Sequence, residues 1–241
     1  MTKRSDLIEK LRKQLYREAN GLFKTDEYTR FFGIPLTRAR SQFYMVQRAC
    51  FMLCRRSCWA LVQARAPFDV KQLIWHHEED ELAGNKERGV ADHYTLGLME
   101  GETVGLKRSD FKTRKPCDGT IVATYAWKHG ADRLPWLAGA ALLGALEIAN
   151  ADKIIKGGGL SHRMANKLRD ELGISIDRQH SNKEHMEVED EHSAFLFDVS
   201  KNHLKTQRDY DEIIEGARTT WAINKTWLGL MANEMAALPD K

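Results

Sequence analysis

The chain has 241 residues, with 37 Lys and Arg against 34 Asp and Glu, so its formal net charge is +3. This even balance excludes a nucleic-acid-binding or membrane-surface protein that could be recognised by charge alone. A hydrophobic content of 42% with only five Pro excludes a disordered chain, and the length predicts a single domain over residues 1–241. Nine His against four Cys direct any metal chemistry toward imidazole and carboxylate ligands.

The N-terminal segment is charged throughout and lacks the apolar core of a signal peptide. The longest apolar run, residues 136–146, is too short to span a bilayer. Cys50, Cys54 and Cys58 recur on one helical face, where we expect packing rather than disulfide bonds or a thiolate zinc site. These features predict a cytoplasmic protein with no membrane or nucleic-acid partner.

Helical signals follow one another along nearly the whole chain, and no run of alternating polar and apolar residues predicts a strand. Thr37 and Ser161 are the expected N-caps of two helices, Gly84 and Gly89 should weaken another, and Gly173 should end one. The expected helices lie at about residues 7–22, 37–65, 69–99, 118–128, 135–155, 161–172, 177–199 and 205–237. The predicted fold class is all-α, with about seven to eight helices.

The most informative segment lies between residues 185 and 192. Because a helix advances about 100° per residue, His185, Glu189 and His192 project from one stripe and can offer two nitrogens and a carboxylate to one point. The alternative is a solvated acidic face, since other acidic residues crowd the same segment. Phe195 and Leu196 continue close to the stripe, which indicates that this face turns inward.

A second candidate is Glu147, which apolar residues surround on every side of its predicted helix. We expect its carboxylate to be buried, and an unpaired buried charge costs several kcal/mol. Either a metal ion or a buried salt bridge to Arg or Lys would remove that cost, so both interpretations stay open.

A third candidate is the pair Glu81 and His93, twelve residues apart and about 120° apart on an unbroken helix. They can share a site only if the helix is interrupted between them, which the two glycines in this segment favour. Glu79 lies about 40° from His93 on a continuous helix, so Glu78 or Glu79 could replace Glu81. A solvated acidic face is the simplest alternative for this region taken alone.

Taken in chain order, these motifs resemble the haem-oxygenase-like di-iron oxidases and oxygenases, relatives of TenA and PqqC. Within that group the sequence is most similar to the undecene-forming fatty-acid decarboxylase and to related enzymes that cleave or desaturate amino acids. The similarity covers about residues 26–214 and rests on Asp80-Glu81-Leu82, Ala91-Asp92-His93-Tyr94, Val104-Gly105-Leu106, Leu146-Glu147-Ile148-Ala149 and the His185, Glu189, His192 triplet. The gap from Glu81 to His93 is longer than the family usually shows.

The resemblance implies a haem-oxygenase-like helical bundle that binds two Fe(II)/Fe(III) ions and uses O2 as co-substrate. The implied metal ligands are Glu81, His93, Glu147, His185, Glu189 and His192. Glu81, His93 and Glu189 would mainly hold one iron and the other three residues the second, with one carboxylate bridging. An external electron donor and a homodimer are further expectations from the same resemblance.

The family acts on small carboxylates, and we expect a free α-amino acid that undergoes oxidative cleavage, desaturation, decarboxylation or nitrile formation. The alternatives are a fatty-acid oxidative decarboxylase, a metal-free enzyme like TenA or PqqC, and a helical interaction protein. A basic residue should hold the substrate carboxylate, but the sequence does not identify it. Aromatic residues that could line a pocket, or only pack in the core, are Phe43, Tyr44, Phe51, Trp59 and Tyr125.

Overall fold

The computed structural model of the chain describes residues 4–239, apart from the side chains of residues 188–191. Its helices are α1 (Arg4–Leu22), α2 (Asp26–Gly33), α3 (Arg38–Arg65), α4 (Phe68–Ala83), α5 (His93–Thr103), α6 (Asp110–Thr113), α7 (Asp118–Arg133), α8 (Trp136–Asn150), α9 (Leu160–Leu172), α10 (His180–His192), α11 (Phe195–His203) and α12 (Gln207–Ala237). A short 3-10 helix, Ile176–Arg178, precedes α10. Within the described residues no strand forms, so the predicted all-α class is confirmed.

The described helices outnumber the expected seven or eight because two predicted segments are divided and two short helices, α2 and α6, were not expected. The segment predicted over 177–199 is split between the 3-10 helix, α10 and α11. The predicted cap Thr37 is confirmed, since its hydroxyl accepts a hydrogen bond from the Arg40 N–H. The prediction of Ser161 as a cap is wrong, because Gly159 takes the N-cap position of α9. Gly173 ends α9 in the left-handed conformation, as predicted.

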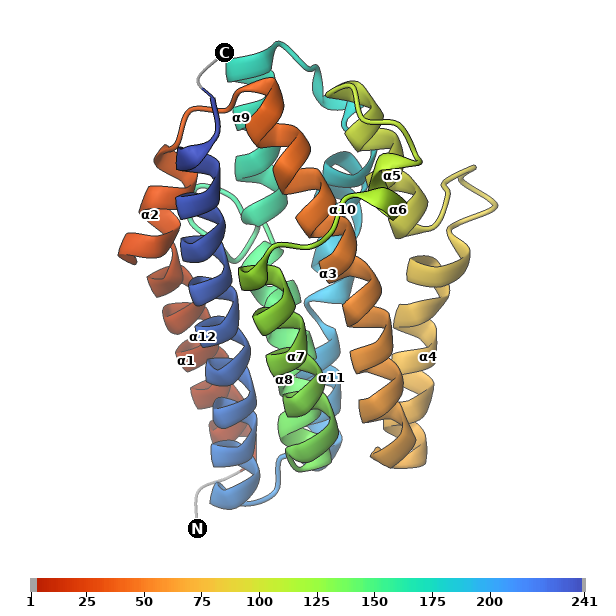
Figure 1. Cartoon of the computed structure of the whole chain (residues 1–241). Helices are drawn as coiled ribbons and strands as arrows, with labels where there is room; N and C mark the ends of the chain where they lie inside the picture. The colour runs from red at the N-terminus through yellow and green to blue at the C-terminus, as the bar shows by residue number, and fades with distance from the viewer. Residues whose placement is uncertain (1–3, 240–241) are drawn as a thin grey trace.

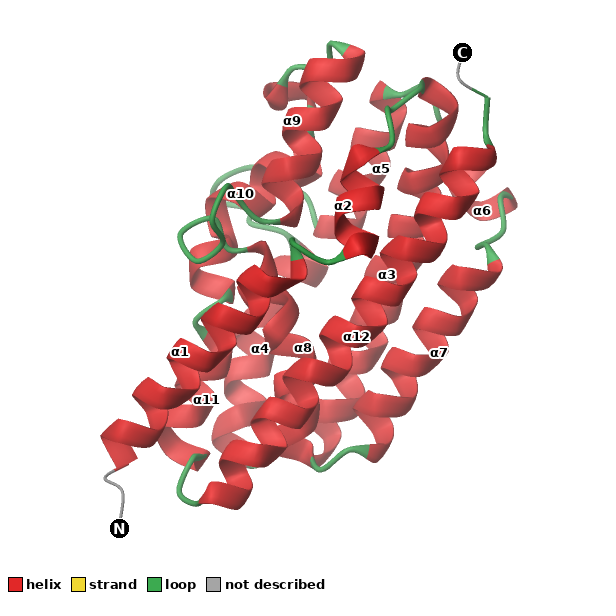
Figure 2. Cartoon of the chain, turned by 90° about the vertical axis from the view of Figure 1, so that its left-hand side faces the viewer, coloured by secondary structure: helices red, strands yellow, loops and turns green. Residues whose placement is uncertain are grey.

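The long helices run side by side along one axis, with the two ends of the described chain at opposite ends of the bundle (Figures 1 and 2). Nearly every residue of α8 is buried, because α1, α3, α7, α10, α11 and α12 all pack against it. A helix that is apolar all round is expected at the centre of a domain. The α8 helix is therefore the internal axis of the bundle, and Glu147 lies on it.

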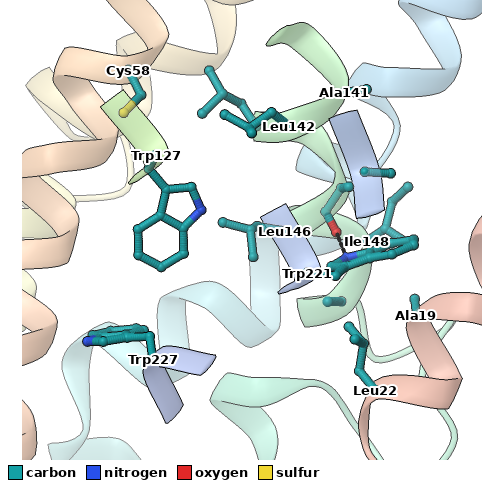
Figure 3. Packing of buried hydrophobic residues seen from close by; sticks show 14 of the residues in the cluster. Ala19, Leu22, Cys58, Trp127, Ala141, Leu142, Leu146, Ile148, Trp221 and Trp227 are labelled. Atoms are coloured by element: carbon teal, nitrogen blue, oxygen red, sulfur yellow. Dashed lines mark hydrogen bonds between the residues drawn. The ribbon is translucent and has the colours of Figure 1, made fainter. Parts of the chain in front are cut away.

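The contact between α8 and α12 depends on small residues and on the satisfied N–H group of Trp221 (Figure 3). A Cβ atom at Gly216 would lie 2.0 Å from the Ala138 carbonyl oxygen, so glycine permits the close approach of the two helices. The Trp221 indole donates to the Ala145 carbonyl oxygen at 2.9 Å. This close packing places Glu147, near the end of α8, inside the bundle.

The cysteine stripe on α3 packs as predicted. All four cysteines are free thiols; Cys54 and Cys58 are buried, and their sulfur atoms lie 3.8 Å apart. Across the part of the chain that the structure describes, no helix combines the length and apolarity needed to cross a bilayer.

Candidate metal centre

The helix that was expected to carry both Glu81 and His93 is interrupted by a hairpin. Gly84 takes a φ of +69°, and a Cβ atom there would lie 2.4 Å from the Val90 carbonyl oxygen, so only glycine fits this turn. Asp92 then caps the N-terminus of α5, which begins at His93. As a result the start of α5 lies beside the end of α4 (Figure 1), and His93 Nδ1 lies 3.1 Å from Glu81 Oε2. Of the two alternatives that the sequence left open, the interrupted helix is therefore the one present, and the two residues lie on different helices.

Two groups of candidate ligands share the carboxylate of Glu81. The His77 group consists of His77, Glu81 and His192, and the His93 group consists of Glu81, His93 and His185. Within each group the ligand atoms lie within 4.8 Å of one another. Ligands bound octahedrally at about 2.1 Å lie about 3 Å from their neighbours and about 4 Å from the opposite ligand. Small adjustments would therefore let each group hold one ion, and Glu81 belongs to both groups.

Three imidazole nitrogens in these groups, His77 Nε2, His93 Nδ1 and His192 Nδ1, are buried and make no hydrogen bond of acceptable geometry. Their nearest carboxylate oxygens lie 3.7 Å away on Glu147 and 3.1 and 3.9 Å away on Glu81, respectively. An unsatisfied buried polar atom costs about 1–3 kcal/mol, so several in one place are unusual in a folded protein. A cation bound by the nitrogen lone pairs would remove this cost. Nitrogen and carboxylate ligands without thiolate suit iron or manganese, so the residues fit such an ion.

Two of the histidines are oriented through their other ring nitrogen. His77 Nδ1 lies 3.2 Å from Glu78 Oε1, and His185 Nδ1 lies 2.8 Å from the Ser181 carbonyl oxygen. With the proton on Nδ1, each Nε2 keeps its lone pair for a metal ion, which is the usual arrangement of metal-binding histidines.

A further network holds the start of α10, the helix that carries His185. Glu100 is fully buried and accepts hydrogen bonds from Arg48 at 3.0 Å and from the Asn182 N–H at 2.7 Å. Arg48 also donates to the Ser181 hydroxyl at 2.9 Å, next to the carbonyl group that orients His185. This network ties α3, α5 and α10 together at the His93 group.

The carboxylates of the site have guanidinium partners on α3. Arg55 forms a short ion pair with Glu147, whose Oε1 also lies 3.7 Å from His77 Nε2. Arg56 lies 2.6 Å from Glu78 and 2.9 Å from Glu81. The salt bridge considered for Glu147 from the sequence is therefore present, and Glu147 also lies beside the His77 group, where it could reach a metal ion.

The same contacts set the pKa values of the carboxylates. Burial alone would raise the pKa of Glu147 and of Glu81. The charge of Arg55 and the nearby His77 instead hold the pKa of Glu147 well below its usual range, while the charge of Arg56 and then that of His93 do so for Glu81. Both carboxylates are thus ionised at neutral pH, as metal ligands must be.

The pKa values of the histidines in the site differ from one another. Burial alone would lower the pKa of His77, but Glu147 and Glu78 raise it to about 9. For His185, burial and the adjacent His93 lower the pKa to about 3. Burial and the charge of His77 lower the pKa of His192 to about 4. At neutral pH, His185 and His192 carry a free lone pair, whereas His77 must lose a proton before it can bind a metal ion.

Five of the six predicted ligands lie together, and the structure distinguishes between the acidic alternatives on α4. Glu81 belongs to both groups, whereas Glu78 contacts Arg56 and His77, and Glu79 is exposed. The predicted Glu189 lies outside the described side chains. The other predicted ligands that the structure brings to this site are His93, Glu147, His185 and His192.

The geometry departs from the sequence prediction in two respects. His185 groups with Glu81 and His93, rather than with Glu147 and His192 as expected. His77 was overlooked, although it lies four residues before Glu81 and so on the same helical face.

A cavity adjoins the site and contains about 810 Å³ of empty space, part of it open to solvent. Its walls are mainly apolar and include two of the predicted aromatic residues, Tyr44 and Phe51. Of the other predicted aromatic residues, Tyr125 is 73% exposed, and Phe43 and Trp59 are not among the lining residues. The charged lining residues are Arg48, Arg55, Arg56, Glu81 and Glu147, and His185 also lines the cavity.

The helical bundle thus brings paired His/Glu groups together beside a cavity, and comparison with known proteins identifies the family. The family model described as "Iron-containing redox enzyme" matches residues 42–225. The chain therefore belongs to this family of iron-containing redox enzymes. No curated protein sequence matches the chain.

Solved structures confirm the haem-oxygenase-like fold. A protein of unknown function with a heme oxygenase-like fold from Shewanella denitrificans is 15% identical, with a TM-score of 0.73 over 94% of this chain and 92% of that chain. A CADD-like protein of unknown function from Nostoc punctiforme is 20% identical, with a TM-score of 0.71 over 94% and 97%. A TenA homologue from P. horikoshii is 13% identical, with a TM-score of 0.61 over 96% and 99%. At these identities the likeness concerns the fold alone.

Proposed function

We propose that the protein is a non-haem di-iron oxidase or oxygenase that uses O2 to oxidise a small carboxylate substrate. One observation carries the proposal: two His/Glu groups share Glu81, and three of their buried imidazole nitrogens have no hydrogen-bond partner. Membership of the iron-containing redox family supports iron as the metal. When bound, two iron ions would supply the electrons and the oxygen-binding positions for O2 activation.

The protein's own residues would hold the ions and orient their ligands. His77 and His192 would serve one ion, with Glu147 within reach, while His93 and His185 would serve the other. Glu189 keeps its predicted place as a further ligand, to be tested by mutation. The Ser181 carbonyl oxygen and Glu78 would hold the protons of His185 and His77 on Nδ1, away from the metal.

The cavity beside the site would bind the substrate. Its apolar walls would exclude water from the reacting bond, and its arginines provide the positive charge that the sequence could not assign to a particular residue. A free α-amino acid remains our proposed substrate, with a fatty acid as the alternative. The electron donor and a homodimeric assembly likewise remain proposals.

Anaerobic loading with Fe(II) tests this function. We expect the wild-type protein to retain two iron ions and to consume O2 rapidly only when a substrate from an amino-acid and fatty-acid panel is present. A visible absorption band that forms with one substrate class would identify that class.

One observation favours a metal-free enzyme of the TenA type: Arg55 and Arg56 already neutralise the site's carboxylates. That alternative predicts no retained iron and unchanged ligand binding after His192→Ala. A helical interaction protein likewise predicts no iron, and also no small-molecule binding in the cavity.

A further inference from the structure

Among the described arginines, Arg55 stands out because one nitrogen of its guanidinium group is buried without a hydrogen-bond partner. Its Nη2 atom donates to Glu147 and, at 3.4 Å, to the Leu143 carbonyl oxygen. Its Nη1 atom is buried and has no hydrogen-bond partner. Arg55 as a residue is only 8% exposed, and it lines the cavity. A permanently charged group with an unsatisfied buried N–H is costly to the fold unless it serves a ligand.

The surroundings hold this guanidinium group in place beside the cavity. Its central carbon lies 5.7 Å from the ring centroid of Phe51 and 5.9 Å from that of Trp59. Aromatic rings at such distances stabilise a cation without neutralising its charge. Phe51 and Trp59 lie on α3, as Arg55 does, so their contacts with its guanidinium group do not involve Glu147. Arg55 can therefore keep its position when its anionic partner changes.

Glu147 is the group for which a metal ion and Arg55 would compete. Its Oε1 atom accepts from Arg55 and lies 3.7 Å from His77 Nε2, a candidate ligand atom with no hydrogen-bond partner. A divalent ion held there would draw on the same carboxylate lone pairs that now accept from Arg55. Two divalent ions would also bring more positive charge than the described carboxylates of the site can balance, so the guanidinium charge would lack a counter-ion.

We infer that Arg55 exchanges partners: it pairs with Glu147 when the site holds no metal ion, and it binds the anionic group of a cavity ligand once metal ions engage Glu147. The inference rests on the proposed function, because it assumes the metal centre. Metal binding and anion binding are then coupled, and each strengthens the other by the same factor. Because the lining is otherwise mainly apolar, the ligand is a carboxylate with an apolar body.

The coupling can be measured without turnover, using Mn(II) as the metal and phenylpropanoate as the probe. Calorimetric titration should show that saturating Mn(II) tightens phenylpropanoate binding by about tenfold, and that phenylpropanoate tightens Mn(II) binding equally. Phenylpropanol, which lacks the carboxylate, should show no such coupling. The neutral probe thus separates charge recognition from binding to the apolar walls.

Two substitutions locate the exchange at Arg55. Arg55→Gln should abolish the coupling and weaken phenylpropanoate binding about tenfold in the Mn(II)-loaded protein, while Mn(II) itself still binds. Glu147→Gln removes the competing charge, so the metal-free variant should bind phenylpropanoate more tightly than the metal-free wild type does. Since this second variant predicts a gain, its success cannot be attributed to loss of folding.

The possible failures are distinguishable. If wild-type protein binds no Mn(II), Fe(II) or other divalent ion, the proposed metal centre is wrong and the exchange falls with it. If Mn(II) binds but does not strengthen phenylpropanoate binding, or if Arg55→Gln retains the coupling, the metal centre stands and the role of Arg55 is overturned. No gain in anion binding by metal-free Glu147→Gln would also overturn it.

Discussion

The His77 group and the His93 group contain the same types of ligand, but His77 of one and His185 of the other lie in opposite electrostatic surroundings. His77 stacks on Trp59 with 4.5 Å between ring centroids and lies between Glu78 and Glu147, which raise its pKa to about 9. His185, in the other group, is desolvated and adjacent to His93, and its pKa is lowered to about 3. Similar ligand sets can therefore differ in how readily they accept a metal ion at neutral pH.

This difference implies an order of binding. The His93 group offers His185 as a neutral imidazole oriented by the Ser181 carbonyl oxygen, so no proton has to leave it when a metal ion binds. The His77 group must release the proton of His77 and compete with Arg55 for the nearby Glu147. We expect the His93 group to fill first and the His77 group to hold its ion more weakly.

The largest expected effect comes from Glu81, the residue that both groups share. Glu81→Ala should reduce the iron retained after anaerobic Fe(II) loading from two ions to none, because both groups lose a ligand and the affinity falls by more than about 100-fold. Metal analysis after gel filtration measures this. The matched control is Glu79→Ala, an exposed carboxylate on the same helix, which should retain both ions. Loss of only one ion in Glu81→Ala would show that Glu81 does not bridge.

The next effect separates the two groups. His192→Ala should remove the ion of the His77 group and leave one iron, whereas His185→Ala should remove the ion of the His93 group. Fe(II) titration should show two binding phases of different affinity. We expect His185→Ala to lower the affinity of the tighter phase, and His192→Ala to lower the affinity of the weaker phase. Anaerobic Fe(II) titration of each variant resolves the phases, with the exposed His129→Ala as control. Equal effects on both phases would contradict the division into two groups.

The pKa of His77 predicts a pH dependence of the metal-free protein. Because this pKa is raised from 6.5 to about 9, protonated His77 contributes stability that is fully present below pH 6.5 and is lost as the pH rises through 9. The lost free energy of unfolding is on the order of 3 kcal/mol. Urea unfolding of wild type and His77→Gln between pH 6 and pH 10 measures it, and the variant should lack this decline.

His185 and His192 should act in the opposite sense. Their lowered pKa values mean that the folded protein resists their protonation, so stability falls as the pH drops from 6.5 toward 4. The metal-free protein should therefore be most stable near pH 6.5. A maximum above pH 9 would contradict the environment that the structure assigns to His77.

The smallest effect concerns the hairpin between α4 and α5. Arg88 on this hairpin lies 2.8 Å from Glu184 and 2.6 Å from Glu187, and so ties it to α10. Because Arg88 is partly exposed, Arg88→Gln should cost less than about 1 kcal/mol and weaken the tighter Fe(II)-binding phase only a few-fold. The surface pair at Arg169 offers the control Arg169→Gln, which should leave both phases unchanged. A change confined to the weaker phase would mean that the hairpin acts on the His77 group, and would contradict this prediction.

Part of the candidate site could be predicted because it follows from local helical geometry. The stripe formed by His185 and His192 and the burial of Glu147 need only the spacing of residues within one helix. The interruption between Glu81 and His93 was likewise visible as two glycines, although the hairpin that brings the two residues within 3.1 Å was not.

The remainder depends on contacts between distant segments. Arg55 pairs with Glu147 across ninety-two residues, and nothing in the local pattern selects Arg55 from the other basic residues. His77 was predictable in principle, since it lies one helical turn before Glu81, but it stands among several charged residues that also suit a solvated face. The division of the predicted 177–199 helix similarly reflects packing of α10 and α11 against α8.

The central claim is that two metal ions share Glu81. Crystals grown with Mn(II) and measured at an X-ray energy where manganese scatters anomalously test it most directly. We predict two anomalous peaks, one beside His77 and His192 and the other beside His93 and His185, both within bonding distance of the Glu81 carboxylate. The account would be contradicted by the absence of any peak at these histidines while Arg55 and Arg56 keep their ion pairs with Glu147 and Glu81.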